Sequence, residues 1–185
     1  MKITTRRITY WAIMLALFCV LGMFSIQFGD TIKVSIQLFI VFLIGMLSPG
    51  LLDSFIISTC YLLLGLFLPI YAGFSSGITP TFGFVIGFIP GSIILTLIAK
   101  IFKEKEIKKM IFGLLIGCIA STIIVYVCGA TFMYFYFQGL GKAKDVLTII
   151  GICITPYIPF DIIKIILSIS VYLALYKPLK VLNLK

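Results

Sequence analysis

Long apolar runs, separated by short polar breaks, dominate this chain. A helix needs roughly 20 mostly apolar residues to cross the hydrocarbon core of a bilayer, and most of the runs approach that length. The predicted helices cover residues 8–26, 34–47, 51–68, 81–102, 110–137 and 159–176. The pattern therefore predicts an all-α membrane protein, a bundle of six transmembrane helices forming a single integral membrane domain over residues 1–185.

Prolines interrupt the stretch before the last predicted helix. Residues 146–155 form an apolar stub that meets Pro156 and Pro159. Proline cannot continue a helical hydrogen-bond ladder. Broken helices at membrane depth are tolerated only where protein or water satisfies the freed backbone groups. We therefore expect residues 145–160 to form one wall of a cavity.

The composition supports a membrane location. Hydrophobic residues make up 62% of the chain and charged residues 11%, with a mean hydropathy of +1.24. Soluble domains hold about 45–50% apolar and about 25% charged residues, so lipid must be the solvent here. The apolar run at 8–26 is too long for a signal-peptide core and lacks a small-residue cleavage site, so we expect it to remain as the first helix.

Basic residues outnumber acidic ones, 15 against 6. They are scattered singly between apolar spans, which argues against a nucleic-acid partner. Lys and Arg collect in cytoplasmic loops, so both termini are predicted to be cytoplasmic. The basic residues then assigned to the cytoplasm are Lys2, Arg6, Arg7, Lys100, Lys103, Lys105, Lys108, Lys109, Lys177, Lys180 and Lys185. Lys33, Lys142 and Lys144 fall outside, and Lys164 lies within a span.

This orientation places the loops at 28–35, 69–80 and 138–158 together on the outer face. The cytoplasmic links are short or plainly basic by comparison. The simplest interpretation is a binding site open to the exterior. The alternative is that any six-span protein must place three ordinary loops outside.

Several kinds of chemistry have no support in the sequence. The chain holds no histidine, and its five cysteines lie in apolar segments without metal-ligand spacing. We therefore predict no metal site and no cofactor. It also lacks a GxxxxGK[ST] phosphate loop and any cluster of catalytic residues. The chain is predicted to be no enzyme, with no energy source of its own.

Two charges within the last predicted helix are the clearest candidates for a binding site. Asp161 and Lys164 lie three residues apart, on one helix face, where each charge costs on the order of 2.5–3.5 kcal/mol at membrane depth. They form either a polar clamp for a small ligand or an ion pair that fixes the helix end. In the clamp, the carboxylate accepts N–H donors and the ammonium meets a carboxylate or carbonyl.

Other polar and aromatic residues are weaker candidates for the same site. Gln37 is the strongly polar residue of the run at 34–47, and an amide in lipid must face protein or ligand. Tyr61, Tyr71 and Tyr157 could supply an aromatic wall with hydroxyl groups. Each tyrosine alone is equally typical of the aromatic belt at a membrane interface.

Small residues four apart recur in three of the predicted helices. Such spacing lets another helix approach closely, and the simplest interpretation is packing within the bundle. The residues concerned are Ala12 and Ala16 in the first helix, Gly83, Gly87 and Gly91 in the fourth, and Gly113 and Gly117 in the fifth.

Four motifs occur in order along the chain. They are VSIQLF, which contains Gln37, YLLLG at 61–65, PIYAGFSSGITPTFGFVIGF at 69–88 and PYIPFDIIK at 156–164. Together they resemble the BioY family, the biotin-specific S components of energy-coupling factor (ECF) transporters. The resemblance extends over residues 32–175.

The resemblance implies a biotin pocket at the outer face, closed by the loops between helices 1 and 2 and between helices 3 and 4. Gly73, in the second of these loops, joins the candidate ligand-binding residues. It also implies a transmembrane EcfT-type subunit, which would dock on Ala12 and Ala16, and two ECF ATPase subunits. Some residues depart from the family's sequence pattern, such as Phe160 and the Thr79-Pro80-Thr81 segment, and these would crowd the pocket rim. Lipoate or another small vitamin therefore remains an alternative ligand, and a small membrane enzyme or self-contained channel an alternative of another class.

Overall fold

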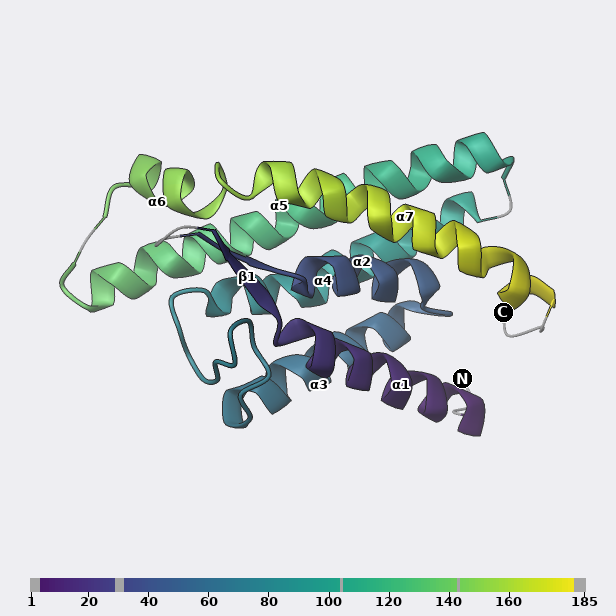
Figure 1. Ribbon diagram of the computed structural model, residues 1–185, viewed down its shortest axis with the longest axis horizontal. Helices are drawn as coiled ribbons and strands as arrows, with labels where there is room; N and C mark the ends of the chain where they lie inside the picture. The colour runs from purple at the N-terminus through teal and green to yellow at the C-terminus, as the bar shows by residue number, and fades with distance from the viewer. Residues whose placement is uncertain (1–3, 29–31, 104, 143, 182–185) are drawn as a thin grey trace.

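The computed structural model describes residues 4–28, 32–103, 105–142 and 144–181, and helices make up most of these ranges. The helices are α1 (Thr5–Gly22), α2 (Gln37–Leu47), α3 (Leu51–Phe67), α4 (Phe82–Phe102), α5 (Ile107–Gly139), α6 (Val146–Cys153) and α7 (Ile158–Val181). Within the described ranges, α1, α4, α5 and α7 are long and apolar enough to cross a membrane, whereas α2 and α3 are shorter. Figure 1 shows how these helices are arranged.

A β-hairpin replaces the end of the first predicted helix and the start of the second. Strand β1 (Ser25–Phe28) pairs antiparallel with β2 (Ile32–Ser35), with Ile26 opposite Val34. The prediction that the first helix continues to residue 26 and the second begins at 34 is therefore wrong. β-branched residues such as these favour an extended backbone, and the facing backbone groups of the two strands pair with each other.

The proline-containing stretch forms an extra short helix. The apolar stub at 146–155 contains α6, and a turn leads from it into α7, where Pro159 occupies the first turn. Proline is tolerated there because the backbone N–H groups of a first turn have no partner within the helix. At eight residues, α6 is about 12 Å long and cannot cross a bilayer.

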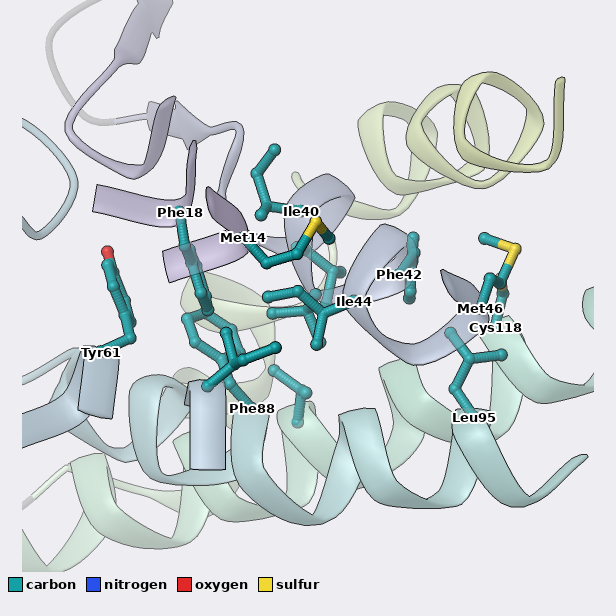
Figure 2. Packing of buried hydrophobic residues seen from close by; sticks show 14 of the residues in the cluster. Met14, Phe18, Ile40, Phe42, Ile44, Met46, Tyr61, Phe88, Leu95 and Cys118 are labelled. Carbon is teal, nitrogen blue, oxygen red and sulfur yellow. The ribbon is translucent and has the colours of Figure 1, made fainter. Parts of the chain in front are cut away.

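The short helix α2 occupies the centre of the bundle. Eight of its eleven residues are buried, and its neighbours include α1, α3, α4 and α7. Figure 2 shows Phe18 of α1, Ile44 of α2 and Phe88 of α4 directed into one apolar cluster. A helix that is apolar on all sides suits such a central position.

Small residues allow α4 and α5 to pack closely. A Cβ atom added at Gly87 would lie 2.9 Å from the Cα atom of Val125, and one at Gly91 would lie 2.9 Å from the Oγ atom of Ser121. On α5, a Cβ atom at Gly117 would lie 2.6 Å from Leu95. Lipid is as apolar as these side chains, so close packing is what favours association of the helices. The predicted role of these glycines within the bundle is confirmed.

The bundle has two distinct ends (Figure 1). One end, which we call the loop end, carries the β-hairpin, the loop at 68–81 and α6. The other, the terminal end, holds the first turn of α1 and the last turn of α7. The prediction that the connections after the first, third and fifth helices share one side is confirmed for the described residues.

Candidate functional site

Asp161 and Lys164 form a buried polar cluster with a third side chain. The Nζ atom of Lys164 donates to Oδ1 of Asp161 at 2.6 Å, and the Tyr126 hydroxyl, from α5, donates to Oδ2 of Asp161. Side-chain exposure is 6% for Asp161 and 13% for Lys164. We call Asp161, Lys164 and Tyr126 the polar clamp.

The polar clamp presents complementary groups side by side. A carboxylate that accepts hydrogen bonds lies directly against an ammonium that donates them, so the pair is neutral overall. Mutual neutralisation reduces the cost of placing both charges at membrane depth. The same arrangement matches a planar ligand group in which a carbonyl stands next to an N–H.

An apolar groove of about 560 Å³ adjoins the clamp between α5 and α6. Tyr126 belongs to both the groove and the clamp. Ile149, Ile150 and Ile154 line the groove from the proline-containing stretch. The predicted wall at 145–160 is therefore found in part: residues between 146 and 154 line this open groove.

Gln37 and Tyr61 belong to a second polar group, on α2 and α3. The Nε2 atom of Gln37 donates to the Tyr61 hydroxyl oxygen at 2.6 Å. The Tyr61 hydroxyl in turn donates to the carbonyl of Ile70 at 2.9 Å. The Tyr61 ring stacks on Phe18 of α1, with centroids 3.6 Å apart and planes 3° from parallel. Tyr61 is fully buried, and its hydroxyl is engaged inside the protein.

Tyr71 and Gly73 fix the loop at 68–81 against the helices. The Tyr71 hydroxyl donates to the carbonyl of Leu62 at 2.6 Å. Burial raises the pKa of the Tyr71 hydroxyl to about 12, so it remains a donor at physiological pH. Gly73 has φ of 72°, which favours glycine, and its N–H donates to the carbonyl of Met23 at 2.9 Å.

The remaining predicted residues lie apart from this second group. Tyr157 is in the turn before α7, and its carbonyl accepts the backbone N–H of Asp161 at 3.0 Å. Ala12 and Ala16 are both exposed on α1. The predicted residues thus occur in three places: the polar clamp with Tyr157 beside it, the cluster around Tyr61, and the exposed face of α1.

Two residues of evident importance escaped the sequence analysis. Tyr126 completes the clamp from a position 35 residues away in sequence, and nothing in its surrounding apolar run distinguishes it from other tyrosines. Asp53 is fully buried and accepts hydrogen bonds from Arg7, at 3.0 and 2.7 Å, and from Trp11, at 2.7 Å. The sequence did point to Asp53, because an acidic residue in an apolar run must find a partner.

The loop packing yields a first prediction. A Cβ atom at Gly65 would overlap the ring of Tyr71, so Gly65→Ala should destabilise the protein by about 1–3 kcal/mol, as overpacking does. A melting curve in detergent measures this. The control is Gly151→Ala in α6, where a Cβ atom would meet nothing within 4 Å and alanine favours the helix. Equal melting temperatures for the two variants would contradict the described packing.

Fold and polar groups together define a class: a multi-pass helical membrane protein with a buried polar clamp and loops gathered at one end. The BioY family model matches residues 1–181, and the chain belongs to this family. It is 28% identical over 176 residues to the biotin transporter BioY of Thermotoga maritima, covering 93% of this chain and 96% of that protein.

A solved structure shares the same fold. The S-component for biotin from an ECF-type ABC transporter superposes with a TM-score of 0.77 at 25% identity, covering 95% of each chain. Both relatives are transport proteins by name. The family therefore identifies a transport component and not an enzyme.

Proposed function

We propose that this protein is the substrate-binding S component of an ECF-type importer and that it binds biotin. Membership of the BioY family supports the transporter class, and the names of the two relatives support biotin as ligand. The loop end would face the exterior and receive the vitamin. Both termini would lie in the cytoplasm, with six helices spanning the plasma membrane of a prokaryotic cell.

The observation that carries the proposal is the 2.6 Å spacing between Lys164 Nζ and Asp161 Oδ1. Groups this close cannot each hold one end of an elongated vitamin. They can hold adjacent atoms of one polar group. The ureido ring of biotin presents a carbonyl beside two N–H groups, so its N–H would donate to Asp161 and its carbonyl would accept from Lys164. Charge-assisted bonds of this kind contribute about 1.5–3 kcal/mol each.

Competition between vitamins tests the choice of ligand. Lipoate has a sulfur ring and a carboxylate chain but no N–H donor, so it could not make the charge-assisted bond to Asp161 that the ureido group would make. We expect lipoate to compete with labelled biotin at least about tenfold less well than unlabelled biotin does.

Desthiobiotin is the matched control for this experiment, because it keeps the ureido group and lacks the sulfur ring. It should compete nearly as well as biotin. Equal competition by lipoate and biotin would show that the clamp does not recognise the ureido group.

We also propose a partner subunit, from the exposed face of α1 and from the lack of a nucleotide-binding motif in the sequence. The chain has no nucleotide-binding phosphate loop, so the free energy for uptake must come through a protein contact. α1 buries only Met14, Phe18 and Gly22, and Ala12 and Ala16 are exposed on it. Small side chains let another helix approach closely. We assign this face to an EcfT-type transmembrane subunit, which would connect the protein to two ATPase subunits.

A further inference from the structure

One tyrosine of α3 contacts the loop end of α1. Phe18 stacks on the Tyr61 ring, and a Cβ atom at Gly22 would lie 2.6 Å from the Tyr61 hydroxyl oxygen. Tyr61 therefore contacts α1 along its last two turns. Phe18 and Gly22 are two of the three buried residues of α1, so these contacts help to hold this end of the helix.

The same tyrosine also joins α2 and the loop at 68–81. Its hydroxyl donates to the carbonyl of Ile70 and accepts from Gln37, the first residue of α2 and the second after strand β2. One side chain on α3 thus hydrogen-bonds to the loop and to the start of α2, and stacks on Phe18 of α1. Each hydrogen bond lies in a dry interior, where it is stronger than in water.

Further contacts connect the loop to the end of α1 directly. The N–H of Gly73 donates to the carbonyl of Met23, and Phe74 meets Phe24 edge to face at 6.4 Å. Phe74 has φ of 57°, a conformation that non-glycine residues adopt only when their surroundings impose it. The loop is therefore held in a strained form by its attachments to α1 and α3.

We infer that Tyr61 is a positioning residue, which ties the loop at 68–81 and the hairpin end of α2 to α1. It acts through its hydroxyl bonds and its stacked ring. The role in transport rests on the proposed function. The resemblance to the family implies that the loop at 68–81 closes the pocket, and in that case a partner that moves α1 would also move the loop through Tyr61.

The attachment of the loop at 68–81 to Tyr61 can be tested in protein without ligand. Tyr61→Phe keeps the ring on Phe18 and removes both hydroxyl bonds. By hydrogen exchange, we expect the amides at 70–77 to exchange about tenfold faster, the equivalent of losing about one net hydrogen bond, while α4 and α5 stay unchanged. Gln37→Leu, which leaves the Ile70 bond in place, should give a smaller increase in the same amides.

Tyr172→Phe is the matched control. Tyr172 is also buried, but it lies on α7 beside a small cavity formed with Ser48 and Lys100, away from the loop. It should leave exchange at 70–77 unchanged. An unchanged loop in Tyr61→Phe, or equal acceleration in every segment, would overturn the inference.

A second arm measures release of labelled biotin from the same variants. Tyr61→Phe should release biotin faster by a similar factor and still co-purify with the coupling module. Faster exchange with unaltered release would overturn the assignment of the loop as a lid. If the wild-type protein bound no biotin, the proposed function would fail, and the exchange experiment would still decide whether Tyr61 holds the loop.

Discussion

Replacing Ala12 or Ala16 by Trp is expected to abolish ATP-dependent biotin uptake while biotin binding in detergent stays normal. Both residues are exposed on α1, and a helix can approach them closely only while their side chains are small. An indole ring would hold a partner helix several ångströms away. The polar clamp lies on α5 and α7, so the ligand site should be unaffected.

Uptake into vesicles reconstituted with the coupling module measures the effect, and co-purification of that module gives a second readout. Ile119→Trp is the control, because Ile119 is a similarly exposed apolar residue on α5. It should transport normally. Normal transport by the Ala12 and Ala16 variants, or uptake in vesicles without any ATPase subunit, would contradict the assignment of α1 as the docking helix.

Removal of either charge of the clamp should produce the second large effect. Asp161→Asn or Lys164→Met is expected to weaken biotin binding by about 1.5–3 kcal/mol, which is about 10- to 150-fold in affinity. Each single change also leaves the other charge buried beside a neutral partner. That costs stability, so the melting temperature without ligand should fall as well.

The double variant Asp161→Asn/Lys164→Met separates binding from stability. It leaves no uncompensated charge, so the melting temperature should recover toward the wild-type value. Biotin binding should stay weak, since neither ionic group is present. Binding of wild-type strength in the double variant, measured by titration calorimetry, would mean that the pair only fixes the start of α7.

The helices could largely be predicted because their apolar runs are long. The fourth predicted helix, at 81–102, corresponds to α4 at Phe82–Phe102. The β-hairpin could not be predicted in the same way. Ser25 and Ile26 continue an apolar run without a break, and short apolar runs fit helix or strand equally well. The strand forms because Ser25 and Ile26 find partners in Ser35 and Val34.

The candidate site was predictable only where its residues are neighbours in sequence. Asp161 and Lys164 share a helix face, so spacing alone predicted their contact, which the structure confirms. Tyr126 joins them through the packing of α5 on α7, which no local pattern reveals. Gln37 was correctly expected to face protein or ligand, but only the structure shows that its partner is Tyr61.

Identification of the bound vitamin tests the central claim most directly. The purified protein, in detergent and without any partner subunit, would be incubated with a panel of vitamins that includes biotin and lipoate. After the free ligands are washed away, mass spectrometry would identify what the protein retains. The proposed function predicts biotin, with its retention lost in the Asp161→Asn/Lys164→Met variant. Retention of lipoate or another vitamin in place of biotin, or of none, would contradict it.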